Sequence, residues 1–331
     1  MAENFAELGR VQAIRQLFEG SGFEPFEEPL WLTAGQQECI TTASGMMLEG
    51  IDFDLVYFPL PHLGRKAVLK VTGELYAVMA HPDSLSVQLG VSAKLDFPQI
   101  KELWSGIVSA AKEHGYRSLS LDLQPSKNGL SIALAATGRH SASVSAARPQ
   151  ARSKDLVCVS GPLGAAYLGL QALQREKANF DKGASNREAL ERYKMLVGAY
   201  LKPDLSAHTV PQLEEDKLVP SFGYFVTRGL ADALLRLQRD SGLGVKVYAD
   251  KMPFEGGSFD LGRELDLDPI SAAMNGGEDF RLLYVVPLAK FDQFRKDFQT
   301  FDIIGHLAQP EAGAVLVTPD GVELPLKAQG W

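Results

Sequence analysis

The feature that most constrains this chain is the short motif NGGEDF at residues 275–280, which runs directly into the apolar segment 282–286. Two glycines, then two carboxylates, then a strand predict a tight turn that presents Glu278 and Asp279 at the mouth of a sheet. An ordinary turn with two solvated acids would give the same pattern. The N-terminal half, where a partner acidic cluster is expected, is nearly bare of aspartate, since no Asp precedes Asp52.

Composition places the chain among soluble globular proteins. It has 331 residues, which suits two domains, and 45% are hydrophobic, which is enough to bury a substantial core. The net charge of −8 argues against nucleic acid or an anionic membrane as a partner. Cys39 and Cys158 form no CxxC pair, no apolar signal segment is evident, and no apolar run approaches the length of a membrane span. We therefore expect a cytoplasmic protein without a membrane segment.

Hydrophobic periodicity predicts a mixed α+β order rather than a strict βαβ alternation. The expected helices cover residues 4–18, 62–80, 97–114 (ending at a Gly115 cap), 165–177, 186–198, 229–240 and 288–299. The expected strands cover residues 84–92, 116–123, 129–137, 155–160, 244–249, 280–287, 302–307, 313–318 and 322–326. The strands at 116–123 and 129–137 are expected to pair around a polar turn, and residues 19–50 are expected to be irregular.

A polar stretch poor in bulky apolar residues, at about 140–153, predicts a boundary between two domains. We therefore expect an N-terminal domain at 1–145 and a C-terminal α+β domain at 150–331.

A junction of strand, glycines and helix at residues 155–165 is a candidate phosphate site. The N–H groups at a helix start are unpaired and the helix dipole there favours anions, so Gly161 and Gly164 are candidate binding residues. The pattern is not a GxxxxGK[ST] loop, and by itself it is explained more simply by a tight turn between a strand and a helix.

Four further side chains are candidates because of their positions. Asp122 lies in the apolar strand SLSLDLQ, where an unpaired carboxylate is costly; a metal or another partner would explain it, and so would an edge position. Glu74 would usually be a solvated helix residue. Arg148 could bind phosphate or be part of a basic linker. Trp331 could be a packed anchor or a stacking surface for an aromatic ligand.

One family resemblance extends in register over seven stretches of the chain. They are residues 47–68, 75–82, 155–173, 201–203, 275–286, 303–306 and 326–331. Together they resemble the thiamine-monophosphate kinase family, in the aminoimidazole-ribonucleotide-synthetase-like superfamily. The resemblance implies an N-terminal domain on the nucleotide and metal side, whose mixed sheet pairs with that of a second subunit in a dimer barrel, and a C-terminal α+β domain. It therefore implies a homodimer that uses ATP and Mg²⁺ to convert thiamine monophosphate to thiamine diphosphate.

The departures from the family lie in its metal-binding motifs. Three motifs that carry acids in the family have none in this chain. Their places are taken by Gly35-Gln36-Gln37, Ala43-Ser44-Gly45 and the run from Phe225 to Leu230, in which Arg228 occupies the position of an acid. Two other motifs keep one carboxylate each, Glu74 and Asp122. Phosphoryl transfer depends on metal ions that neutralise phosphate charge, and Mg²⁺ needs oxygen ligands in near-octahedral geometry.

We therefore expect Mg²⁺ binding and catalysis to be impaired or lost, with Asp122 and Glu74 as remnants of the metal and catalytic site. A small phosphorylated ligand is still expected, and its candidate contacts are Arg148, Gly161, Gly164, Arg228, Gly277, Glu278, Asp279 and Trp331. Two alternatives remain open. One is an active kinase with a reduced metal shell, and the other is a non-catalytic ligand-binding or interaction protein.

Overall fold

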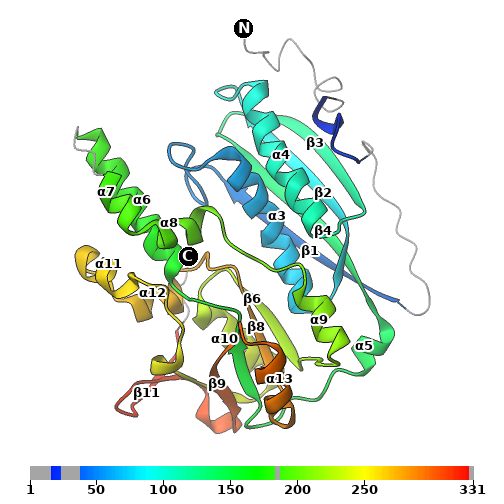
Figure 1. Ribbon diagram of the computed structural model, residues 1–331, viewed down its shortest axis with the longest axis vertical. Coiled ribbons are helices and arrows are strands. Elements are labelled where there is room, and N and C mark those ends of the chain that lie inside the picture. The colour runs from blue at the N-terminus through cyan, green and yellow to red at the C-terminus, as the bar shows by residue number, and fades with distance from the viewer. Residues whose placement is uncertain (1–15, 24–37, 183–186, 328–331) are drawn as a thin grey trace. The chain divides into compact units, whose positions relative to one another are not determined.

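The computed structural model of the chain describes residues 16–23, 38–182 and 187–327. It divides into two compact units, the first formed by residues 1–75 and 79–145 and the second by residues 76–78 and 146–331. Each unit has one sheet with helices packed on it, which confirms the predicted α+β class (Figure 1). Most of the helix predicted at 4–18 lies outside the described residues, as do the segment containing Gly35 and the candidate Trp331.

The first unit contains a four-stranded sheet in the order β1-β4-β2-β3. Its strands are β1 (Glu38–Leu48), β2 (His81–Ser92), β3 (Ser118–Ser126) and β4 (Ser131–Ser141). Strand β2 lies between β3 and β4, parallel to the former and antiparallel to the latter, so the predicted pairing of β3 with β4 is wrong. The reason is that a helix connects β2 to β3 and brings them together as parallel neighbours.

Strand β1 corrects a second expectation, because it lies within the segment predicted to be irregular. It pairs along its whole length with β4, from Glu38 opposite Ser141 to Leu48 opposite Ser131. Its sequence, ECITTASGMML, lacks a clean apolar alternation because one of its faces is not part of the core.

Helices α3 (Leu60–Ala77) and α4 (Phe97–Glu113) lie against one face of this sheet (Figure 1). Asp96 and Gln99 form a capping box at the start of α4, and the helix ends at His114, followed by Gly115 with a φ of 73°. The two helices approach closely at small residues: a Cβ on Gly106 would lie 2.0 Å from the Pro61 carbonyl oxygen. Glycine is therefore required there for the helices to pack.

The opposite face of the four-stranded sheet carries small and polar side chains. Residues paired in register share a face, and one such row crosses all four strands as Met46, Ala133, Gln88 and Asp122. Met46 is 56% exposed. The neighbouring inward row, which includes Leu121, Val87 and Leu134, is buried. Within the first unit, Asp122 thus lies on the sheet face opposite to α3.

The second unit contains a seven-stranded sheet in the order β11-β10-β7-β9-β5-β8-β6. Its strands are β5 (Leu156–Val159), β6 (Phe222–Val226), β7 (Gly244–Tyr248), β8 (Arg281–Val286), β9 (Asp302–Ala308), β10 (Ala314–Val317) and β11 (Glu323–Pro325). All of the strands predicted from residue 155 onward are present, and β6 was missed. The short β6 has the sequence FGYFV, with three aromatic residues and one glycine, and shows no regular alternation.

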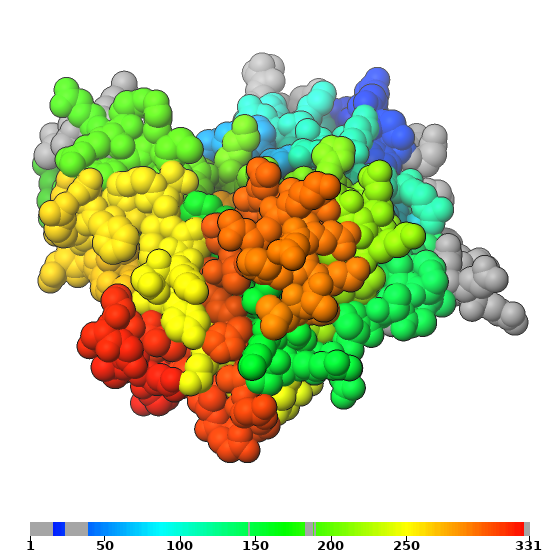
Figure 2. Space-filling view, turned by 60° about the horizontal axis from the view of Figure 1, so that its bottom comes forward, coloured from blue at the N-terminus to red at the C-terminus, as the bar shows by residue number. Residues whose placement is uncertain are grey.

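The helices of the second unit are α6 (Ala165–Asp181), α7 (Arg187–Arg192), α8 (Lys194–Leu201), α9 (Thr209–Glu215), α10 (Leu230–Ser241), α11 (Ser258–Leu265), α12 (Pro269–Asn275) and α13 (Phe291–Asp297). The helix predicted at 186–198 is divided at Tyr193, and α9, α11 and α12 were missed because each is short. Buried side chains from α6, α8, α11 and α12 form one apolar cluster, and the corresponding green and yellow surfaces adjoin in Figure 2. In the described part of the chain, no helix has the length and apolar character needed to cross a membrane.

We expect Gly106→Ala to destabilise the first unit by about 1–3 kcal/mol, because the new methyl group would meet the backbone of α3. Urea unfolding followed by circular dichroism would measure the change. Gly198→Ala in α8 is a matched control, since a Cβ there has no neighbour within 4 Å and Ala favours helix. An unchanged unfolding midpoint for Gly106→Ala would contradict this account of the α3–α4 contact.

Candidate functional site

Three turns meet at one end of the seven-stranded sheet. They connect β5 to α6 (residues 160–164), β6 to α10 (residues 227–229) and α12 to β8 (residues 275–280). Strand β8 lies between β5 and β6 and is antiparallel to both, so its first residues lie beside the last residues of the other two strands. The sheet thereby brings together the GPLG junction and the NGGEDF motif, which are more than a hundred residues apart in sequence.

The NGGEDF motif forms an unusual turn. Gly277, Glu278 and Phe280 have φ values of 77°, 63° and 54°, which lie in the left-handed region that favours glycine. The Glu278 N–H donates to the Thr227 carbonyl at 2.9 Å, and the Phe280 N–H donates to the Val226 carbonyl at 3.0 Å. These bonds fasten the motif to the turn that follows β6.

Arg228 lies in that neighbouring turn and its side chain is exposed. Its Cα is 3.5 Å from the position that a Cβ on Gly277 would take, so the two turns are in contact. Gly229 is just as close to the other side of the motif, because a Cβ there would lie 2.4 Å from the Met274 carbonyl oxygen. The structure therefore places the exposed residue Arg228 directly beside the NGGEDF turn.

Asp279 connects the motif to helix α6. Its side chain is buried, and it accepts hydrogen bonds from the N–H groups of Gly164 at 2.8 Å and Ala166 at 3.3 Å. The helix start predicted to attract an anion does hold one, but the anion is the protein's own carboxylate. A phosphate could reach these two N–H groups only by displacing Asp279.

Burial raises the pKa of the Asp279 carboxyl to about 7. The hydrogen bonds from Gly164 and Ala166 and the positive charge of Arg281 act in the opposite direction. The Arg281 Nε donates to the Pro162 carbonyl at 3.3 Å, and its guanidinium carbon lies 3.3 Å from where a Cβ on Gly161 would be. Gly161 therefore leaves room for the cation that partly offsets the buried carboxylate.

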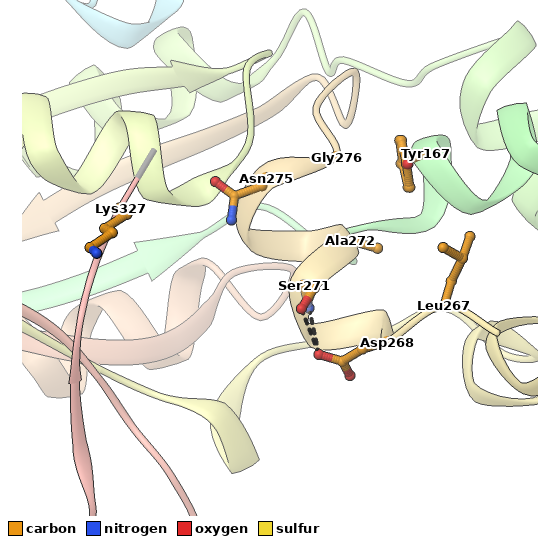
Figure 3. Close-up of a pocket in the computed structure, with 8 residues that line it drawn as sticks. All are labelled: Tyr167, Leu267, Asp268, Ser271, Ala272, Asn275, Gly276 and Lys327. Atoms are coloured by element: carbon orange, nitrogen blue, oxygen red, sulfur yellow. Dashed lines mark hydrogen bonds between the residues drawn. The ribbon is translucent and has the colours of Figure 1, made fainter. Parts of the chain in front are cut away.

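A cavity of about 400 Å³ adjoins the motif on the side of α12 (Figure 3). It is lined by Tyr167, Leu267, Asp268, Ser271, Ala272, Asn275, Gly276 and Lys327. Asp268 caps α12 and accepts from the N–H of Ile270 at 3.2 Å and of Ser271 at 3.0 Å. Lys327 contributes the positive charge of the lining, and in Figure 3 it lies on the same side of α12 as Asn275.

Arg148, a predicted phosphate contact, donates a hydrogen bond to the protein's own backbone. It is half-buried, burial lowers its pKa, and it donates to the Val78 carbonyl at 3.1 Å. The buried hydroxyl of Tyr284 donates to the Tyr76 carbonyl at 2.7 Å. Both side chains thus donate hydrogen bonds to carbonyl groups within residues 76–78, which belong to the second unit.

The remnant metal residues are not brought together within the first unit. Asp122 is on the open face of the sheet, 3.3–3.4 Å from the Gln124 amide, whereas Glu74 is on α3, which covers the other face. In the described ranges, no group of three or more His, Cys, Asp or Glu side chains could hold a metal ion. Within the first unit, the structure therefore does not bring Asp122 and Glu74 together on one face of the sheet.

Sequence reasoning missed most of the cavity lining, including Tyr167, Asn275 and Lys327 as binding residues. One available signal was the pair Asp268-Pro269, since an Asp cap followed by Pro at the first helical position marks a helix start. That signal would have predicted α12 and placed Asn275 at its end, beside the glycines. Lys327 lies in the last stretch that carries the family resemblance.

No protein-family model matches the chain. It is similar to curated thiamine-monophosphate kinases, among them that of Pyrococcus horikoshii, with 27% identity over 273 residues, 81% of this chain and 78% of the relative. AaThiL, the thiamine monophosphate kinase of Aquifex aeolicus, has been solved in complex with AMPPCP and TMP. That structure has a TM-score of 0.71 at 20% identity and covers 97% of this chain and 96% of its own.

A second solved structure shares the fold equally well. The E. coli hydrogenase maturation protein HypE has a TM-score of 0.71 at 16% identity, covering 97% of this chain and 98% of its own. The structures confirm the predicted fold, and the curated relatives confirm the predicted resemblance to the thiamine-monophosphate kinases.

The burial of Asp279 predicts a pH dependence of stability. The carboxyl ionises near pH 3.8 in the unfolded chain and near pH 7 when folded, so the unfolded state loses its proton first as the pH rises. The stability contributed by the protonated form is complete below about pH 4 and is lost as the pH rises towards 7, by up to roughly 4 kcal/mol. Asp279→Asn lacks this titration.

Urea unfolding of both proteins between about pH 4 and pH 8 would measure the effect. The free energy of unfolding of the wild type should fall relative to that of Asp279→Asn across this interval. Parallel curves for the two proteins would show that Asp279 does not titrate in this range.

Proposed function

We propose that this relative of the thiamine-monophosphate kinases binds a small phosphorylated or nucleotide-like ligand, while the family's phosphoryl transfer is impaired or lost. The reaction implied by the resemblance is the ATP-dependent phosphorylation of thiamine monophosphate to thiamine diphosphate. The observation that carries the proposal is the combination of a cavity at the NGGEDF turn with carboxylates that do not converge on a metal.

The cavity supports ligand binding. Its volume of about 400 Å³ is in the range of small-molecule sites, and its wall includes Asn275 and Gly276 of the motif itself. Lys327 in the lining and Arg228 beside Gly277 supply two positive charges that suit a phosphate group. The similar protein AaThiL has been solved with AMPPCP and TMP, which is consistent with ligands of this class.

The positions of the acidic side chains support the loss of catalysis. Asp279 is committed to the start of α6. Asp122 is on the open face of the sheet in β3, whereas Glu74 is on α3, which covers the opposite face. Arg228 replaces an acid of the family motif. A divalent ion about 4 Å from its guanidinium would be repelled by roughly 8 kcal/mol at an effective dielectric of 20, less with solvent exposure.

Two rival functions make different demands on the chain. An active kinase with a reduced metal shell would need Asp122, Glu74 and Asp279 to act together as ligands. A protein that only interacts with other proteins would not need the cavity at all. The separation of Asp122 from Glu74 disfavours the first rival, and the cavity beside the family motif disfavours the second.

A homodimer is the second part of the proposal. The open face of the four-stranded sheet presents small side chains such as Ser44 and Ala135 with little charge, and Met46 is 56% exposed on it. Such a face suits pairing with the same face of a second copy, as the resemblance implies. The free cysteines Cys39 and Cys158 support the cytoplasmic location that we also propose.

Purified protein incubated with Mg·ATP and thiamine monophosphate should yield no thiamine diphosphate above a no-protein blank, because no described carboxylate cluster can position the metal. Chromatography would quantify the product. Turnover by the wild type that is abolished in Asp122→Asn would instead establish a kinase with a reduced metal shell.

The same preparations test binding by a heat-shift measurement with ATP, ADP, thiamine monophosphate and thiamine diphosphate. At least one ligand should raise the unfolding midpoint by several degrees, and the rise should be smaller in Arg228→Gln. Arg295→Gln, an exposed Arg on α13 outside the cavity, is the matched control and should behave as the wild type. No shift with any of the four ligands would remove the ligand-binding part of the proposal.

We expect the protein to sediment as a dimer of the 36.0 kDa chain and Ala135→Arg to sediment as a monomer. Ala135 is exposed on β4, so the new charge leaves the unit folded but cannot be buried between two sheets. Ala147→Arg, at an exposed position after the sheet, is the control and should remain dimeric. A monomeric wild type would refute the dimer.

A further inference from the structure

A second cavity, of about 450 Å³, lies between helices α6, α7 and α11 of the second unit. It is lined by Arg175, Glu176, Asn179, Glu188, Arg192, Tyr193 and Glu264. None of these residues lines the cavity at the NGGEDF turn. Tyr167 of the first cavity and Arg175 of the second are eight residues apart on α6, which is about 12 Å along the helix axis.

Glu176 is the most informative residue of this lining, because it is only 9% exposed. One of its carboxylate oxygens, Oε1, accepts from the Arg175 Nε at 3.1 Å and from the Asn179 amide at 3.5 Å. Among the residues that the structure describes, no donor reaches the other oxygen, Oε2, which is buried. A buried carboxylate oxygen without a donor is costly, so a ligand that supplies an N–H group would stabilise this site.

The opposite wall is organised around Glu264. Its carboxylate accepts from the Tyr193 hydroxyl at 2.6 Å, from the Arg192 Nη1 at 2.9 Å and from the Arg175 Nη1 at 3.3 Å. The Arg192 guanidinium also lies over the Tyr193 ring, 5.1 Å from its centroid. Each guanidinium has five N–H donors, so Arg192 and Arg175 keep donors beyond those directed at Glu264.

The cavity therefore offers acceptors and donors together. Two arginines and three glutamates are in its lining. Glu176 supplies a hydrogen-bond acceptor, and the guanidinium of Arg192 supplies donors. A simple anion would be repelled by the three carboxylates, and a simple cation would be repelled by the two guanidinium groups. A small molecule with opposite charges at its two ends satisfies both.

We propose that this cavity binds a free amino acid. The ammonium group of the ligand donates to Glu176 Oε2, which turns from its buried position towards the cavity on binding, and the carboxylate of the ligand accepts from the guanidinium of Arg192. An ammonium has three donors and a carboxylate accepts from a guanidinium in a planar fork, so both ends are matched by groups of this lining. The site is independent of the proposed phosphate-ligand site and of any kinase activity.

Calorimetric titration of the full-length protein with L-alanine, L-glutamate, L-lysine and L-phenylalanine, each at millimolar concentration, tests this proposal. At least one should bind, and methylammonium and acetate, which carry one charge each, should bind more weakly. Binding of none of the four amino acids, or equal binding of methylammonium or acetate, would overturn it.

Two variants locate the site. Glu176→Gln and Arg192→Gln should each weaken the binding by at least about tenfold, the loss expected for one charge-assisted hydrogen bond. Arg192 has a side chain that is 62% exposed, so its variant tests the site even if Glu176→Gln fails to fold. Arg263→Gln, which changes an exposed Arg of α11 paired with Asp260, should bind as the wild type. Unchanged affinity in Arg192→Gln would place the ligand elsewhere and refute the proposal.

Discussion

The contact between the Asp279 carboxylate and the first N–H groups of α6 is the interaction on which the candidate site depends. It joins the turn before β8 to the helix after β5, across a sequence separation of 115 residues. Three left-handed residues, Gly277, Glu278 and Phe280, bend the motif so that Asp279 points at the helix start. The helix dipole and two hydrogen bonds partly offset the cost of burying this carboxylate.

This contact also changes which groups near the NGGEDF turn are available to a ligand, compared with the expectation from the sequence. Because Asp279 fills the helix start, the phosphate ligand that we propose would have to contact side chains around the turn, among which Arg228 and Lys327 are exposed cations. The glycines retain a role, but it is steric: a side chain at Gly164 would lie 2.8 Å from the Ala273 backbone nitrogen. The motif thus builds the wall of a cavity through close backbone packing, and charged side chains from other segments complete it.

The sequence predicted those features that are set by local chemistry. The turn at 275–280 and the strand after it follow from glycine freedom and an apolar run, and both are observed. The partner of Asp279 could not be predicted, because it depends on the order of strands in the sheet. The same limit explains the false pairing of β3 with β4, where a polar turn suggested a hairpin although β2 lies between them. Asp122 was expected either to need a partner inside an apolar strand or to lie at an edge. Strand β3 is at the edge of its sheet, and strand alternation places Asp122 on the open face between buried Leu121 and Leu123.

The positions that depart from the thiamine-monophosphate kinase motifs are ones the fold can change at little energetic cost. Arg228 is exposed, so a cation at this position does not have to be buried. Gly45 lies against Val71 and Lys70 of α3, where a Cβ would be in van der Waals contact at 3.4 Å, so a small residue fits this position. By contrast, Asp279 is buried and bonded to α6, and its loss would remove a contact that orders three turns. The fold therefore does not depend on acids at the first two positions, whereas Asp279 is held in place by its contact with α6.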